Sequence, residues 1–215
     1  MDCLVQKTYR GPVKLTVKGR ATRQRIIEGA AAHLRSDETA GVTLDDIRAI
    51  TGTSKGQIFH YFPGGKEELF LAVAQFEADR VLDDQQPHLG ALTSWAAWQR
   101  WRDAVVARYR AQGRSCPLGV LMGELGNTPG AQEVISTLLR QWESELHRGI
   151  VEMQGAGLVR QELDPSRLSA ALIAGIQGGV QVLRSTGSVA YLEAVLDTLL
   201  DHLRISGLAG PKMRS

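Results

Sequence analysis

The stretch from Val42 to Leu69 constrains the fold most, because it carries two short helix signals that are separated by a turn signal. Thr43 is a hydroxyl N-cap, and Asp45 and Asp46 follow it where negative charge suits the helix dipole. The apolar residues of this segment recur at intervals of three, which turns one face inward; they are Leu44, Ile47 and Ile50. Gly52 then supplies the left-handed conformation that ends a helix.

A second short helix is predicted directly after this turn, with Thr53 or Ser54 as its cap and Ile58 and Phe62 as its apolar anchors. A crowded polar and aromatic set lies between the anchors: Lys55, Gln57, Phe59, His60 and Tyr61. Burial does not require these residue types together, whereas reaching into a DNA groove does. The whole stretch is therefore interpreted as a helix-turn-helix followed by the start of a third helix.

The chemistry of these side chains gives each a predicted role on DNA. Lys55 can donate to guanine and Gln57 can bond adenine, while Gly56 lets the backbone approach closely. Phe59 either contacts a thymine methyl group or braces the helix. Phosphate contacts are expected from Thr43, His60, Tyr61 and Lys66, and Thr53 at the helix start completes the set. For Lys66 the competing interpretation is local pairing with a neighbouring glutamate.

The same residues resemble a known family. Residues 53–69, Thr-Ser-Lys-Gly-Gln-Ile-Phe-His-Tyr-Phe-Pro-Gly-Gly-Lys-Glu-Glu-Leu, are similar to the recognition helix and turn of the TetR family of bacterial transcriptional regulators, and residues 21–34 resemble its first helix. The likeness runs from about Arg20 to Val73. Two departures are Phe59, where the family usually has Tyr, and an extra residue at Gly64-Gly65, a variant of one branch. The Cys-Pro-Leu-Gly segment at Cys116 is similar to one in the C-terminal domain of that branch.

The rest of the chain contains helical patterns and no convincing strand pattern, so the expected fold class is all-α. Helices are expected at about residues 20–35, 66–83, 94–112, 131–154, 165–185 and 189–206, besides the two short ones. The predicted domains are a basic arm (1–19), a helix-turn-helix DNA-binding domain (20–66), a helical effector-binding and dimerisation domain (67–206) and a tail (207–215).

Charge is distributed unevenly along the chain, although the net charge is only +2. Residues 1–68 hold 11 Lys and Arg against 8 Asp and Glu, and residues 1–25 hold seven basic residues against one acidic residue. Such an arm can lie along phosphates or enter the minor groove. The alternative is a solvated tail.

An aromatic stripe in the second domain predicts either ordinary core or the wall of an apolar ligand chamber. The candidate pocket residues are Trp98, Trp101, Cys116, Met122, Trp142 and Gln177. For Cys116 a buried apolar role is favoured over redox sensing, because only Arg114 adjoins it as a basic residue.

The last two helices predict a homodimer. The first is rich in small residues, which allow close helix approach, and the second has a wide apolar face; together they would form a four-helix interface between two copies. The candidate interface residues are Leu172, Gly175, Gly179, Leu192, Val195 and Leu199. Packing within one chain is the alternative.

Enzyme signals are weak. Gly52-Thr-Ser-Lys-Gly56 fits a nucleophile-elbow pattern but lacks the preceding strand. No zinc spacing occurs, no cofactor or metal is expected, and neither a membrane-spanning run nor a signal-peptide core is present, which favours a cytoplasmic location. The resemblance implies a repressor released from a palindromic DNA operator by a small apolar or aromatic ligand. The alternative is a ligand-independent architectural or interaction protein that only dimerises through its C-terminal region.

Overall fold

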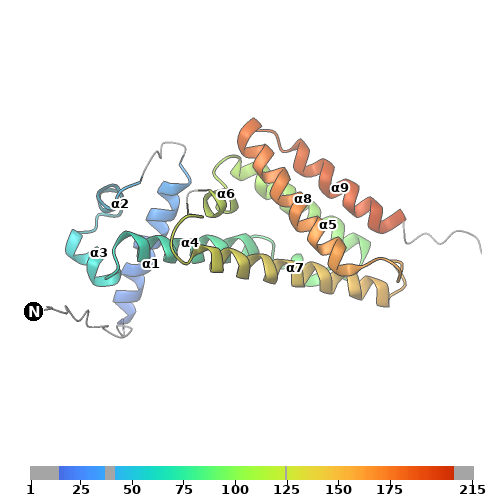
Figure 1. Ribbon diagram of the computed structural model, residues 1–215, viewed down its shortest axis with the longest axis horizontal. Helices are drawn as coiled ribbons and strands as arrows, with labels where there is room; N and C mark the ends of the chain where they lie inside the picture. Colours follow the sequence, from blue (N-terminus) through green and yellow to red (C-terminus); the bar gives the residue numbers. More distant parts are fainter. Residues whose placement is uncertain (1–14, 37–41, 124, 206–215) are drawn as a thin grey trace, which may run out of the picture.

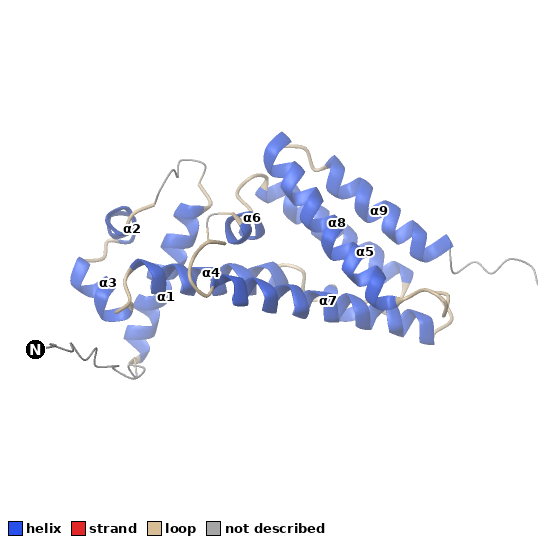
Figure 2. Ribbon diagram, viewed as in Figure 1, coloured by secondary structure: helices blue, strands red, loops and turns tan. Residues whose placement is uncertain are grey.

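The computed structural model describes residues 15–36, 42–123 and 125–205, and within these ranges the chain forms helices and turns without a strand (Figure 2). This confirms the expected all-α class. The elements are α1 (Val17–Leu34), α2 (Leu44–Thr51), α3 (Lys55–Tyr61), α4 (Lys66–Asp83), the 3-10 turn η1 (Leu89–Ala91), α5 (Trp95–Gln112), α6 (Pro117–Met122), α7 (Ala131–Gly155), α8 (Pro165–Thr186) and α9 (Ala190–Ile205).

The predicted arm and tail lie largely outside the described residues. At the inner edge of the arm, α1 begins at Val17, three residues earlier than expected, because Thr16 caps it by accepting a hydrogen bond from the backbone N–H of Gly19.

Helices α1 to α3 gather at one end of the molecule (Figure 1). Their small core contains fully buried side chains from each element, namely Ile26, Ile47, Ile58 and Phe62. Helix α4 closes this core with Leu69 and Val73, which are also fully buried. The sequence therefore folds locally into the expected helix-turn-helix, and α4 packs against it as the fourth helix of this core.

Helix α4 continues from this end along the long axis of the molecule, beside α6 and α7 (Figure 1). Glu77, in the second half of α4, is completely buried and pairs with Arg35, the C-cap residue of α1. The joint between the two parts of the molecule thus contains a buried ion pair. Because a buried charge without its partner destabilises the folded state, removal of either Arg35 or Glu77 is expected to lower the free energy of unfolding.

The second part of the molecule is a bundle in which α8 packs against both α7 and α9 (Figure 1). The tryptophans Trp98, Trp101 and Trp142 are its largest fully buried side chains. Two ion pairs join α5 to α9 near its surface: Arg102 to Asp197, at 2.7 Å, and Arg110 to Glu193, at 2.6 Å.

Helix α6 has no counterpart among the expected helices. Cys116 is its N-cap, with its Sγ accepting from the N–H of Gly119 at 3.2 Å, and Pro117 occupies the first turn, where a missing N–H costs nothing. The Arg184 side chain of α8 crosses this short helix and donates to the carbonyl of Gly119 at 2.9 Å.

Candidate nucleic-acid interface

The start of α2 is fixed by a capping box. The Thr43 hydroxyl accepts from the Asp46 N–H at 3.2 Å, and the Asp46 carboxylate accepts from the Thr43 N–H at 2.8 Å. The Thr43 hydroxyl also donates to this carboxylate at 2.7 Å, and this bond, with the backbone bond, holds the pKa of Asp46 below its ordinary value. Thr43 is exposed, but its hydroxyl proton and its backbone N–H are both bonded to the Asp46 carboxylate, so donation to a phosphate would require this box to open.

Helix α3 begins with a second capping box, and Ser54, not Thr53, is the cap. The Ser54 hydroxyl accepts from the Gln57 N–H at 3.2 Å, and Gln57 Oε1 accepts from the Ser54 N–H at 3.0 Å. In this conformation Gln57 can offer only its Nε2 donors to a base. A bidentate contact with adenine would require the capping box to open.

Thr53 requires a correction, because its side chain does not reach the surface. The residue is 4% exposed. Its hydroxyl donates to the Thr51 carbonyl and accepts a hydrogen bond from the Thr51 hydroxyl at 2.9 Å. These bonds close the turn around Gly52, which has the left-handed φ of 57° expected for a helix end. Thr53 thus has a structural position here and not a DNA-facing one.

The outer face of α3 does present the other predicted residues together. Lys55, Gly56, Gln57, Phe59 and His60 are exposed, and Tyr61 is half-buried with its ring edge-on to His60 at 4.8 Å. Phe59 is 42% exposed and its Cε1 lies 3.4 Å from the position that a Cβ on Gly65 would take. The ring therefore lies beside the turn after α3, in keeping with the bracing role.

Lys66 lies exposed in the first turn of α4 with its Nζ 5.0 Å from the centre of the Phe70 ring. No ion pair joins it to Glu67 or Glu68 among the described contacts, and Glu68 instead accepts from the Gly64 N–H at 2.6 Å. The N-cap Gly65 provides no side-chain bond, so the first amides of α4 stay available for an anion.

Arg48 is a candidate that the sequence analysis missed. It lies on α2, beside a shallow groove that α2 forms with the turn before α3; the other lining residues are Asp45, Ala49, Gly52, Thr53 and Ser54. One guanidinium nitrogen pairs with Asp45, while its buried Nε lacks a partner in the described structure. The sequence could have identified Arg48, because it directly follows the inward-facing Ile47 and therefore falls on the polar side of α2.

The predicted ligand-pocket residues are mostly packed into the core. Trp98, Trp101, Trp142 and Cys116 are each 1% exposed or less, and Met122 and Gln177 are half-buried. Burial raises the pKa of the Cys116 thiol, which agrees with an apolar role. Trp101 donates to Gln85 Oε1 at 3.0 Å, whereas Trp142 Nε1 and Gln177 Nε2 are buried without a partner among the described residues.

The predicted interface residues divide into two groups. Leu172 and Leu192 are buried within the chain itself, and Gly175 and Gly179 lie against α9: an added Cβ would stand 2.8 Å from a Val195 methyl and from the Leu192 Cα, respectively. Val195 and Leu199 are half-buried. Gly175 and Gly179 therefore allow α8 to pack closely against α9, and only the partly exposed members of the set can meet a second copy without rearrangement.

Other types of site find no support in the described part of the chain. Its His, Cys, Asp and Glu side chains form no group of three or more that could hold a metal ion. None of its helices combines the length and the apolar character that crossing a bilayer demands.

Two family models match this chain. Residues 26–73 match "Bacterial regulatory proteins, tetR family", and residues 93–199 match "Tetracyclin repressor-like, C-terminal domain". The first covers the helix-turn-helix and the start of α4, and the second covers most of the bundle.

Similar proteins include two transcriptional repressors. Over 62 residues the chain is 42% identical to the HTH-type transcriptional repressor AcnR of Corynebacterium efficiens, a match spanning 29% of this chain and only 32% of AcnR. Over 191 residues it is 27% identical to the HTH-type transcriptional repressor DhaR of Mycobacterium sp. strain GP1, spanning 84% of this chain and 91% of DhaR. A TetR-family regulator from Cytophaga hutchinsonii has a similar solved structure, with a TM-score of 0.77 at 23% identity, over 92% of this chain and 100% of that one.

Proposed function

Because the chain belongs to the TetR family of transcriptional regulators, which are not enzymes, we propose that it represses transcription by binding a palindromic DNA operator as a homodimer and is released by a small ligand. The observation that carries the proposal is the outer face of α3, where Lys55, Gly56 and Gln57 are exposed together on a rigidly capped helix. TetR-family regulators bind DNA and dimerise. The names of AcnR and DhaR as repressors favour repression.

In the proposed DNA complex, different residues contact the bases and the phosphates. Lys55 and the Nε2 donors of Gln57 read base edges in the major groove, and Thr43, His60, Tyr61 and Lys66 hold phosphates. Two copies of α3 would meet half-sites whose centres are roughly 34–36 Å apart, or a multiple of that distance. Operator symmetry then follows from protein symmetry.

Release by a ligand requires a difference in affinity between two states. Helix α4 closes the DNA-binding core and continues into the bundle, so a ligand that changes its tilt changes the separation of the two recognition helices. A coupling free energy of about 1–3 kcal/mol is typical for such systems.

The second candidate function is that of a ligand-independent DNA-binding protein whose bundle only dimerises. The close burial of Trp98, Trp101 and Trp142 favours it, because the predicted aromatic chamber is filled by its own side chains. This candidate would be supported if no small molecule that binds the protein lowered its affinity for the operator.

Selection of operators from random duplexes at two salt concentrations tests the main proposal. We expect a palindrome, with affinity that falls steeply as salt rises. Lys66→Ala should weaken binding to all sequences and lower the salt slope by about 1, whereas Gln57→Ala should change the preferred sequence. Arg160→Ala, in the exposed turn after α7, is the control of equal charge change. Weak binding without sequence preference would refute the proposal.

A further inference from the structure

The Arg48 side chain of α2 is incompletely bonded in the structure. Among the described residues its guanidinium has a single partner, Asp45, which accepts from Nη1. The Nε atom is buried and has no partner in the described part of the chain. Because a buried donor without an acceptor destabilises the conformation that contains it, Arg48 gains from any movement that brings Nε to an acceptor.

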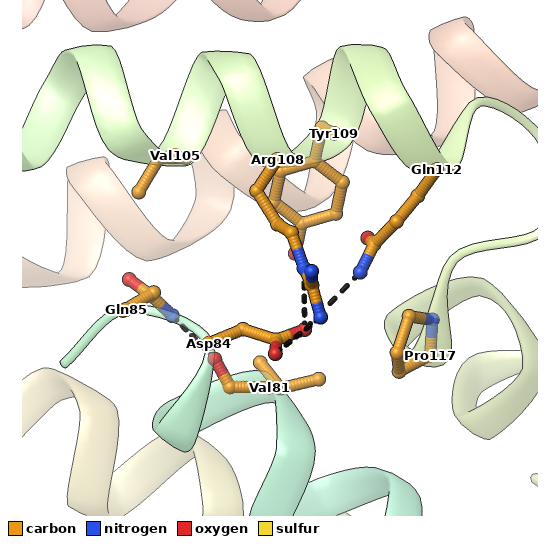
Figure 3. A pocket seen from close by; sticks show the side chains of 8 residues that line it. All are labelled: Val81, Asp84, Gln85, Val105, Arg108, Tyr109, Gln112 and Pro117. Carbon is orange, nitrogen blue, oxygen red and sulfur yellow. Dashed lines mark hydrogen bonds and ion pairs between the residues drawn. The ribbon is translucent and has the colours of Figure 1, made fainter.

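Arg108 shows what a fully bonded arginine looks like in this protein. Where α4 meets α5, it donates from Nε, at 2.8 Å, and from Nη2 to the two carboxylate oxygens of Asp84 (Figure 3). This two-point geometry is the stronger form of pairing with a carboxylate or a phosphate. Arg48 meets Asp45 through Nη1 alone, so the Nε edge of its guanidinium is unused.

The ion pair between Arg48 and Asp45 is also easily exchanged. The Asp45 side chain is 80% exposed and that of Arg48 is 37% exposed, and an exposed pair three positions apart on one helix contributes little stability. An acceptor that meets two guanidinium nitrogens would therefore compete well with Asp45. Arg35 is different, because its partner Glu77 is completely buried and cannot be replaced from solvent.

The groove beside Arg48 has room for such an acceptor. Its space of about 560 Å³ is open to solvent, so a group from outside the chain can enter it. Ser54, which lines the groove, is also the N-cap of α3 and is bonded to Gln57, a predicted base-reading residue. The groove therefore adjoins the surface that is proposed to face DNA, and a duplex seated on α3 brings its backbone close to Arg48.

We propose that Arg48 contacts a phosphate of the DNA backbone and that Asp45 occupies its guanidinium until DNA binds. A carboxylate shares with a phosphate its negative charge and its paired oxygen acceptors, so Asp45 is an internal competitor for the same donor. On binding, Arg48 turns into the groove and donates from Nε and Nη2 to phosphate oxygens, while Asp45 stays in water. The inference rests on the proposed function for its partner, DNA, and adds that Asp45 lowers the affinity.

The exchange is tested by measuring the affinity of the full-length protein for DNA by fluorescence anisotropy at several salt concentrations. One duplex carries the operator that wild type selects, and the other has a random sequence. Arg48→Ala should weaken binding to both and lower the salt slope by about 1 for each half-site. Arg48→Lys keeps the charge and should keep most of the slope. Asp45→Asn should bind both duplexes about two- to tenfold more tightly.

A double variant separates competition from simple repulsion of DNA by Asp45. If Asp45 acts by occupying Arg48, Asp45→Asn strengthens binding less in the Arg48→Ala background, because no guanidinium is left to release. Equal gains in the two backgrounds would overturn the exchange. Arg160→Ala and Glu162→Gln, which break an exposed pair in the turn after α7, are the controls and should leave the affinity unchanged.

The outcomes separate this contact from the proposed function. Wild-type affinity of Arg48→Ala for a selected operator would overturn the contact and leave the function. A changed base preference in Arg48→Ala would mean that Arg48 reads a base, and would overturn the phosphate assignment. Absence of a selected operator, with Arg48 and Asp45 still setting the affinity for random duplex, would overturn sequence-specific repression and leave the contact.

Discussion

At the scale of single residues, both short helices of the DNA-binding end begin with reciprocal side-chain and backbone bonds. The sequence predicted Thr43 and Gly52 correctly, because capping and left-handed turns depend on residues a few positions apart. It could not choose between Thr53 and Ser54, since both carry a hydroxyl. The choice depends on Thr51, whose buried side chain bonds Thr53 and leaves Ser54 to cap.

Ser54→Ala removes the cap and one half of the box. We expect a loss of about 1 kcal/mol of unfolding free energy and greater freedom of the Gln57 side chain. Urea unfolding measures the first effect. Ser185→Ala, at an exposed serine within α8, is the control and should change stability by less than about 0.5 kcal/mol. Equal losses in the two variants would contradict a specific role for the cap.

Glu77 should make stability depend on pH. Burial raises its pKa above the ordinary value of 4.5, although Arg35 and Arg80 act in the opposite direction. The folded protein therefore holds this proton to higher pH than the unfolded chain does. The stability contribution of that proton is full below about pH 4.5 and is lost as pH rises through the folded-state pKa.

Comparison with Glu77→Gln isolates this titration. As pH rises from 4.5 to 7, the unfolding free energy of wild type should fall relative to the variant, by at most about 1.4 kcal/mol per pH unit. Chemical unfolding at several pH values measures the difference. Asp79→Asn, at an exposed carboxylate of α4, is the control. A difference that grows in favour of wild type would show that the pairing with Arg35 dominates over burial.

At the scale of elements, local patterns predicted the long helices well, with α4 expected at residues 66–83 and found there. Helix α6 was missed because it has only six residues and contains a glycine whose role is not local. A Cβ on Gly119 would lie 2.6 Å from the Arg184 side chain, 65 positions further along the chain. Contacts over such separations leave no periodic signal in the sequence.

The small residues of α8 allow a matched test. Gly179→Ala places a methyl group 2.8 Å from the backbone Cα of Leu192, which cannot rotate away, so we expect a loss of about 1–3 kcal/mol. Gly178→Ala meets nothing within 4 Å and should gain about 0.5–1 kcal/mol from helix propensity. Thermal and urea unfolding measure both. A destabilised Gly178→Ala variant would mean that this position is covered by a second copy.

At the scale of the whole molecule, the proposed dimer depends on side chains that one chain leaves partly open. Leu199 of α9 is half-buried, so Leu199→Glu should shift the protein toward monomer and weaken operator binding by about tenfold or more. Sedimentation equilibrium measures the mass. Leu158→Glu, in the turn after α7, is the control because this leucine is also partly exposed, at 37%. A Leu199→Glu protein that folds and remains dimeric would exclude this face.

The continuity of the core through α4 limits how regulators of this kind can be recombined. Leu69 and Val73 complete the core under α1 to α3, and Ala78 and Val81 on the same helix belong to the buried cluster that extends into the bundle. In a chimera joined at residue 66, the recognition helices of one parent would pack against the α4 side chains of the other parent. A breakpoint beyond Val81 keeps these core contacts within one parent. Transfer of operator specificity to another regulator therefore requires the whole of α4 to be transferred together with α3.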